Sequence, residues 1–246
     1  MIRVINLDRS PERIAALAPQ LDTLGMPWQR LRAVEPDPVD WRDLTNVART
    51  RRYYNRDLTR GETGCFLSHC KALREFLDSG DDRCLVLEDD VVTLPDTAAT
   101  LTVLPGVLAS PVARGWHCVN LSSSYARRRS LIGRIGDNRV WHAWRFPMLT
   151  SALLWNRVGA RAWLDHVERD GLHMPIDNQL RLWMARTGGG VSLDQPVFGL
   201  DDCETTLQSD HGPHGYHPRN GLKDLRQKVP LALWSLYHQT AAAIRR

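Results

Sequence analysis

Short apolar runs alternate with amphipathic stretches along most of the chain. Residues 2–7 and 84–87 are apolar runs too short for a helix, which is typical of buried strands, and residues 28–34, 116–121 and 191–197 predict further strands. Apolar residues at helical spacing predict helices that end at Gly25 and Gly80, and helices over residues 97–108, 156–167 and 177–186. Because strands and helices alternate, the sequence predicts an α/β fold with a mainly parallel, twisted sheet and helices on both faces.

Two helix starts carry capping signals. Ser10 is a natural N-cap and Pro11 a natural first helical residue. Thr59 and Glu62 have the spacing of a capping box, in which each side chain accepts a hydrogen bond from the other residue's backbone N–H group. Residues 127–144 contain two glycines and several arginines, and they predict a loop or ribbon.

The composition is that of a globular protein with an uneven charge distribution. The chain has 246 residues, 43% of them hydrophobic and 24% charged, which is enough for one sizeable core. The net charge of +4 is concentrated in three basic clusters, at residues 42–60, 127–129 and 219–246. Each cluster is either a solvated face or a surface for anionic partners such as phosphates, acidic lipids or nucleic acid.

The cysteines and the N-terminus predict a reducing, cytoplasmic location. The five cysteines are odd in number and include no C-x-x-C pair, which argues against a disulfide framework and against a zinc knuckle. The first residues do not read as a signal peptide, because a short apolar stretch runs directly into charged residues. No run approaches the ~18 apolar residues that a membrane-spanning helix needs.

Three adjacent carboxylates, Glu88, Asp89 and Asp90, follow the apolar run at residues 84–87. Ligands of open α/β sheets bind beyond the carboxyl ends of the strands, and adjacent carboxylates repel one another unless a cation is near. Hard oxygen ligands of this kind suit Mg²⁺ or Mn²⁺. In an extended segment Glu88 and Asp90 would face the same site. A solvent-exposed acidic turn is the alternative interpretation.

Four sequence motifs occur in order along the chain. VINLDRSPER (residues 4–13) and LTRGETGCFLSH (residues 58–69) resemble the opening and the central motif of glycosyltransferase family 25, the lipopolysaccharide-type galactosyltransferases. Glu88-Asp89-Asp90 falls about twenty residues later, as in the family, and PIDNQL (residues 175–180) is similar to its Pro-x-Asp motif. Beyond Val197 the similarity fades.

The resemblance implies a GT-A-like nucleotide-binding fold and a catalytic domain over residues 1–221. It implies a nucleotide-sugar donor, commonly UDP-galactose, a divalent Mn²⁺ or Mg²⁺ ion, and inversion at the anomeric carbon. The expected reaction is transfer of a hexose to a saccharide acceptor of lipopolysaccharide or a related surface glycan.

The matched motifs suggest roles for individual residues. Asp90 is the expected direct metal ligand, and Glu88 or Asp89 is expected to contact the metal or the donor ribose. The residues that end the first strand, where the nucleotide is expected, are Asn6, Leu7, Asp8 and Arg9. Asp8 has the alternative role of a turn or helix-start residue.

Inverting transfer needs a base for the acceptor hydroxyl, and the Pro-x-Asp match suggests Asp177. The alternative is that Asp177, after Pro175 and before a helix, is only an N-cap. GT-A enzymes often add a late histidine to the metal shell, which suggests His211, with His214 and His217 as neighbours. A surface loop is the alternative for these histidines.

Residues 222–246 form a basic amphipathic segment. Apolar residues such as Leu233 and Trp234 are mixed with lysines and arginines. This pattern suits peripheral contact with an anionic membrane, which would place the protein at the inner face of the cytoplasmic membrane. The alternative is a helix that covers the core.

Three other functions compete with the transferase interpretation. A metal-dependent phosphohydrolase would need further ligands, and the sequence has no H-x-H or D-x-H spacing to supply them. A non-catalytic relative that only binds sugar nucleotides is disfavoured by the presence of Glu88-Asp89-Asp90 and Asp177. A nucleic-acid-binding module is suggested by the arginine clusters, but only residues 51–54 interleave basic and aromatic side chains, so no nucleic-acid partner is expected.

Overall fold

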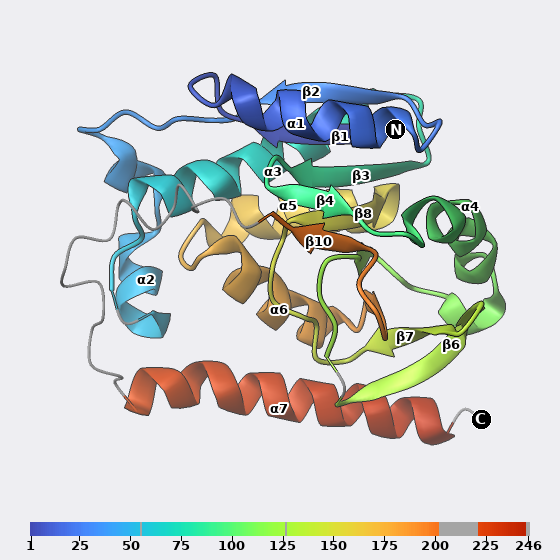
Figure 1. Cartoon of the computed structure of the whole chain (residues 1–246). Helices are drawn as coiled ribbons and strands as arrows, with labels where there is room; N and C mark the ends of the chain where they lie inside the picture. The colour runs from blue at the N-terminus through green and yellow to red at the C-terminus, as the bar shows by residue number, and fades with distance from the viewer. Residues whose placement is uncertain (55, 126, 202–220, 245–246) are drawn as a thin grey trace.

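The computed structural model describes residues 1–54, 56–125, 127–201 and 221–244 (Figure 1). Its main sheet has eight strands in the order β2-β1-β3-β8-β5-β9-β7-β6, and β4 pairs with β10 in a second, two-stranded sheet. The strands are β1 (Ile2–Asn6), β2 (Trp28–Arg32), β3 (Arg83–Glu88), β4 (Val91–Thr93), β5 (Cys118–Asn120), β6 (Arg129–Ile135), β7 (Asn138–Ala143), β8 (Ala152–Asn156), β9 (Gly190–Leu193) and β10 (Phe198–Leu200).

The main sheet is mixed, with most strands in one direction. β8 and β7 run antiparallel to both of their neighbours, so the other six strands all point the same way. The carboxyl ends of β1, β3 and β5 therefore meet at one edge of the sheet. The predicted α/β class with a mainly parallel sheet is confirmed.

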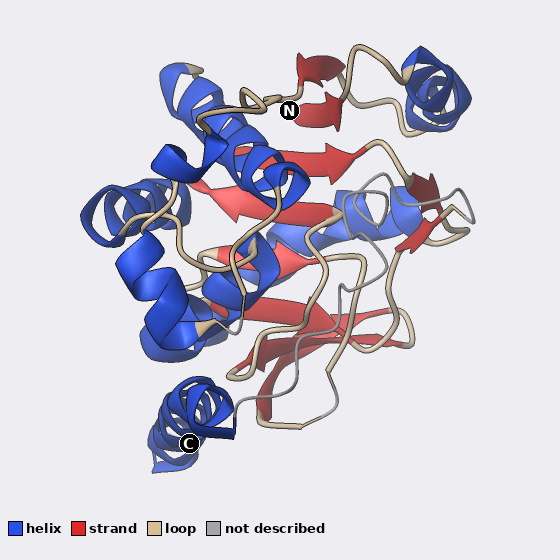
Figure 2. Ribbon diagram, turned by 90° about the vertical axis from the view of Figure 1, so that its left-hand side faces the viewer, coloured by secondary structure: helices blue, strands red, loops and turns tan. Residues whose placement is uncertain are grey.

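Helices cover both faces of the sheet (Figure 2). α1 and α4 pack on one face, while α3, α5 and α6 pack on the other, and each face has its own buried apolar cluster. The helices are α1 (Pro11–Asp22), α2 (Val47–Tyr53), α3 (Arg60–Asp78), α4 (Thr97–Leu108), α5 (Arg157–Asp170), α6 (Ile176–Thr187) and α7 (Gly221–Ile244), with two short 3-10 helices, η1 (Trp41–Leu44) and η2 (Pro111–Ala113).

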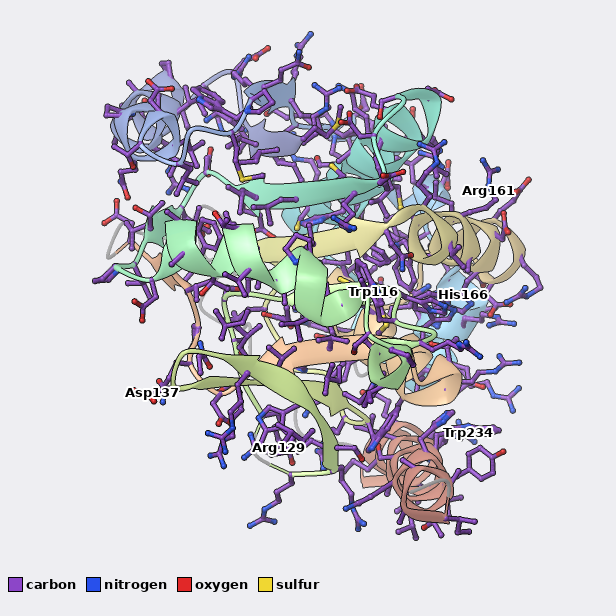
Figure 3. The ribbon with its side chains drawn as sticks, turned by 90° about the vertical axis from the view of Figure 1, so that its right-hand side faces the viewer. Trp116, Arg129, Asp137, Arg161, His166 and Trp234 are labelled. Carbon is purple, nitrogen blue, oxygen red and sulfur yellow. The ribbon has the colours of Figure 1, made fainter. Side chains whose placement is uncertain are left out.

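The local capping signals have different outcomes. Thr59 accepts a hydrogen bond from the Glu62 backbone and Glu62 accepts one from the Thr59 backbone, so the predicted capping box opens α3. Ser10 occupies the N-cap position of α1 but makes no capping hydrogen bond with its side chain. Residues 127–144 contain the β6–β7 hairpin, with Asp137 at its turn (Figure 3), so the ribbon alternative is correct.

β8 is absent from the predicted elements, although Ala152–Trp155 is as apolar as β3. It enters the sheet between β3 and β5 and runs against both. A short buried apolar run does not indicate whether its strand runs parallel or antiparallel to its neighbours. The expected alternation of strand and helix also fails here, because β8 follows β7 without a helix between them.

The C-terminal helix α7 packs on α6 and α2, at the bottom of the molecule in Figure 1. Ser235 is buried and its hydroxyl donates to the Trp144 carbonyl at 2.8 Å, and the His238 ring stacks on the Trp144 ring. One face of the helix therefore covers the core. Within the described residues, no helix is both long and apolar enough to cross a membrane.

Candidate active site

One pocket of about 390 Å³ opens at the sheet edge where β1 and β3 end. Its lining comes mainly from the ends of these strands, from the segment after β2, from the N-terminal half of α3, from residues 149–151 before β8 and from the start of α6. It includes most of the residues suggested by the sequence: Asn6, Leu7, Arg9, Glu88, Asp89, Asp90 and Asp177. Predicted residues as distant in the sequence as Asn6 and Asp177 are thus brought to one site, since β1 and β3 are parallel neighbours and the start of α6 lines the same pocket.

Asp89 is held in place by the end of β1. Its Oδ2 accepts a hydrogen bond of 2.6 Å from the Asn6 side chain, and its Oδ1 accepts one of 3.3 Å from Arg13 on α1. Asn6 is fully buried, and its Oδ1 in turn accepts a bond of 2.7 Å from Arg30 on β2. Asn6 therefore positions a carboxylate of the neighbouring strand end.

Glu88 is the innermost carboxylate of the three. Its Oε1 accepts hydrogen bonds from Thr150 at 2.8 Å and from His69 Nε2 at 3.0 Å, with the Cys65 thiol 3.9 Å away. Burial raises the pKa of Glu88, but the bonds from His69, Thr150 and Cys65 outweigh it, so the pKa lies below its ordinary value. Glu88 is thus anionic and fixed by α3, as expected for a buried carboxylate with several donors.

Asp90 lies in the turn after β3, with an unsatisfied oxygen. Its Oδ1 is buried and has no hydrogen-bond partner among the described residues. Burial, followed by the charges of Glu88 and Asp89, raises the pKa of Asp90 to about 7. Glu88 and Asp90 share the pocket because of this turn, not because they alternate along an extended strand as expected.

These carboxylates fit a hard divalent cation such as Mg²⁺ or Mn²⁺. A cation beside Asp90 would supply the missing partner for Oδ1 and offset the repulsion among the three charges. Cys65, His69 and Glu88 also place one ligand atom each within 4.8 Å of one another. This second set is less suitable, because burial and the charge of Glu88 raise the pKa of the Cys65 thiol well above its ordinary value, so the thiolate that binds metal is disfavoured.

Asp177 lies in the first turn of α6 and lines the same pocket. Pro175 takes the N-cap position, so the interpretation of Asp177 as the N-cap is wrong. The hydrogen bonds to its carboxylate, from the backbone and side chain of Asn178, both end on Oδ1. Burial, helped by the charges of Glu62 and Glu88, raises the pKa of Asp177 despite these bonds.

One predicted residue lies outside the pocket. The Asp8 carboxylate forms ion pairs with Arg30 at 2.6 Å and Arg32 at 2.7 Å on β2 and is absent from the pocket lining, in agreement with the alternative of a turn residue. His211, with His214 and His217, is outside the described residues. Arg9 lines the pocket and also pairs with Glu35.

Several pocket residues were missed from the sequence. Thr150 binds Glu88, and Leu149 beside it has a φ of 69°, a strained value for a leucine. Leu149 is held there because the buried Asn120 at the end of β5 donates to its carbonyl at 2.8 Å. No local pattern signals these contacts, since they join segments that are distant in the chain.

Comparison with known proteins finds a family match for the N-terminal part of the chain. Residues 1–104 match the model described as "Glycosyltransferase family 25 (LPS biosynthesis protein)". The resemblance seen in the sequence is therefore confirmed over this region, which includes β1, α3 and the three carboxylates but not Asp177.

Two relatives and one solved structure illustrate the similarity. A "Glycosyltransferase 25 family member" from Aedes aegypti is 32% identical over 96 residues, 37% of this chain and 16% of that protein. "Procollagen galactosyltransferase 2" from Mus musculus is 54% identical over 39 residues, 16% of this chain and 6% of that protein. The matched regions thus span less than a fifth of either relative. The structure of a glycosyltransferase involved in glycosylation of the major capsid of PBCV-1 aligns over 93% of this chain and 98% of that one, with 10% identity and a TM-score of 0.43.

Proposed function

We propose that this chain is a metal-dependent, inverting glycosyltransferase with a GT-A-like nucleotide site. The donor proposed is a nucleotide sugar, UDP-galactose first among them, and the acceptor is a saccharide of lipopolysaccharide or a related surface glycan. The observation that carries the proposal is that one pocket holds both a carboxylate cluster suited to a divalent cation and a separate aspartate with a raised pKa. The family match over residues 1–104 supports the class of reaction.

Asp90 is proposed as the main metal ligand, with Glu88 and Asp89 beside it. When bound, the cation would neutralise the negative charge that develops on the nucleoside diphosphate leaving group. Asn6 and Arg13 keep Asp89 in position, and His69 and Thr150 keep Glu88 in position. Leu7 and Arg9, at the end of β1, line the part of the pocket proposed for the nucleotide.

Asp177 is proposed as the base. The acceptor oxygen forms a bond to the anomeric carbon while the bond from that carbon to the diphosphate oxygen breaks, and the hydroxyl proton passes to the Asp177 carboxylate. Its raised pKa makes Asp177 a stronger proton acceptor than an ordinary aspartate. Because Glu88 contributes to that raised pKa, the proposed base lies within electrostatic reach of the metal ligands.

The test is binding and hydrolysis of a panel of nucleotide sugars, with Mn²⁺ and with EDTA. The proposal expects Mn²⁺-dependent binding or slow hydrolysis of one donor by the wild type. Asp90→Asn should lose both, while Asp137→Asn, at the exposed turn of β6–β7, should keep both. Absence of binding to every donor with Mn²⁺ present would refute the transferase proposal and equally a non-catalytic relative that only binds sugar nucleotides.

We also propose that α7 touches the inner face of the cytoplasmic membrane. The exposed face of this helix is rich in large apolar side chains: Leu225, Val229, Leu233, Trp234, Leu236 and Tyr237. Arg226 and Lys228 add positive charge on the same helix, and Trp234 lies at the outer edge of the molecule (Figure 3). An amphipathic helix that exposes aromatic and basic residues suits an anionic lipid surface.

A further inference from the structure

Two arginines from different parts of the chain converge on one tyrosine. The guanidinium of Arg145, which follows β7, lies 5.0 Å from the centre of the Tyr125 ring. The guanidinium of Arg181, on α6, lies 5.3 Å from the same ring. The two positive charges therefore share one aromatic partner, which brings them close together.

Neither arginine forms an ion pair with an acidic side chain among the described residues. The Nε atom of each is buried and makes no hydrogen bond in the described part of the chain. Burial, followed by the like charge of Arg145, lowers the pKa of Arg181. Two neighbouring, partly buried guanidiniums that form no ion pair repel each other, and an anion bound between their planar donors would offset this repulsion.

Arg181 lies on the helix that brings Asp177 to the pocket, although neither arginine is among the residues that line it. Arg181 is four residues after Asp177 on α6, so the two side chains lie on the same face of that helix, and the Asp177 charge acts on Arg181. The donor diphosphate is proposed to bind at the cation that Asp90 holds, after the end of β3, whereas Arg181 is close to Asp177. Arg181 is therefore associated with the base that receives the acceptor proton.

Asn120, at the end of β5, connects the segments that carry the other two side chains. Its Nδ2 donates to the carbonyls of Met148 and Leu149, in the segment that follows Arg145. Its Oδ1 accepts the backbone N–H groups of Ser122 and Ser123, in the segment that precedes Tyr125. The buried amide thus holds both segments at the sheet edge where the pocket opens.

We propose that Arg145 and Arg181 form an acceptor subsite for an anionic group, a carboxylate or a phosphate carried by the saccharide. This inference rests on the proposed function, because it takes Asp177 to mark the acceptor side of the pocket. A forked pair of guanidiniums suits either anion, since both offer two oxygens in one plane to parallel N–H donors. The subsite would select charged acceptors over neutral ones.

The experiment measures binding of matched sugars by titration calorimetry at saturating UDP and Mn²⁺, so that the donor site is occupied. N-acetylglucosamine 6-phosphate and glucuronic acid are compared with N-acetylglucosamine and glucose, and inorganic phosphate is a separate arm. The proteins are wild type, Arg145→Gln, Arg181→Gln, Arg181→Lys and, as the matched control on the same helix, the exposed Arg186→Gln. Thermal unfolding confirms that each variant is folded.

The wild type is expected to bind the anionic sugars at least tenfold more tightly than the neutral ones. Each Arg→Gln change at 145 or 181 should remove that preference, Arg181→Lys should keep part of it because the charge remains, and Arg186→Gln should keep all of it. Equal binding of charged and neutral sugars by the wild type would overturn the subsite. So would inorganic phosphate that binds as tightly as the sugar phosphate, which would indicate a bare anion site.

The two proposals fail in different ways. If Arg181→Gln weakens binding of UDP with Mn²⁺ but leaves sugar binding unchanged, the arginines serve the donor diphosphate and the acceptor subsite is wrong. If the wild type binds no UDP, the transferase proposal fails, and with it the assignment of this subsite to an acceptor. The same titrations without UDP then show whether the arginines bind anions at all.

Discussion

Asp90→Asn is expected to stabilise the metal-free protein near pH 8 while it abolishes Mn²⁺ binding. Burial and the charges of Glu88 and Asp89 raise the pKa of Asp90 from its ordinary value of 3.8 to about 7. At pH 8 Asp90 is ionised in both states, and its charge is less favourable in the folded chain than in the unfolded chain, which lowers the free energy of unfolding. Asparagine has nearly the same shape without the charge.

The magnitude follows from the pKa. The pKa of Asp90 rises by about three pH units, and at about 1.4 kcal/mol per unit this corresponds to an upper limit of about 4 kcal/mol in the free energy of unfolding. Relaxation of the turn and the shared charge of its neighbours reduce this, and we expect about 2 kcal/mol. For a chain of this size that is a rise in Tm of about 4 to 8 °C.

The effect of Asp90→Asn on the free energy of unfolding depends on pH. Because the folded pKa of Asp90 is raised, its favourable contribution is complete below pH 3.8 and is lost as the pH rises through about 7. The advantage of the asparagine variant should therefore be larger at pH 8 than at pH 5. An aspartate with an ordinary pKa would give little difference between these two conditions.

The assay is thermal unfolding followed by circular dichroism, in EDTA and in Mn²⁺, at pH 5 and pH 8, with Asp137→Asn as the control. In EDTA at pH 8 the Asp90 variant should unfold at a higher temperature than the wild type. Added Mn²⁺ should stabilise the wild type and leave the variant unchanged. A variant that is less stable than the wild type in EDTA at both pH values would show that Asp90 is satisfied without a cation, and would refute the reasoning.

Three further predictions concern other parts of the molecule. Asp177→Asn should reduce transfer to an acceptor by about 10²- to 10⁴-fold, while donor binding measured by calorimetry stays intact; full transfer activity would exclude Asp177 as the base. Gly64→Ala should destabilise the fold by about 1 to 3 kcal/mol in denaturant unfolding, because a Cβ there would lie 2.6 Å from a backbone carbonyl of the segment after β2; Gly80→Ala, with open space around it, is the control, and equal stability of the two variants would contradict the packing argument. Trp234→Ser combined with Tyr237→Ser should weaken binding to anionic liposomes in a flotation assay without changing the Tm, since both side chains are exposed; unchanged binding would rule out membrane contact through this face of α7.

The local sequence determined most of the individual elements. The helix predicted over residues 97–108 coincides with α4, and the capping box at Thr59 and Glu62 forms as expected at the start of α3. These outcomes depend on neighbours within a few residues, where periodicity and side-chain capping decide the backbone conformation. The carboxylates of the pocket were also found from the sequence, because a charged cluster after a buried strand is a local signal.

Only the tertiary structure decided how these pieces meet. The antiparallel entry of β8 between β3 and β5 delivers Thr150 to Glu88, and the choice of β1 as the neighbour of β3 delivers Asn6 to Asp89. No local sequence pattern predicts either strand pairing, because the free energy that selects it comes from burial of apolar side chains across the whole sheet. The same holds for Arg145 and Arg181, which look like ordinary surface arginines in the sequence. They form the proposed anion site only because folding places both over one tyrosine, with the Nε atom of each buried and without a hydrogen bond among the described residues.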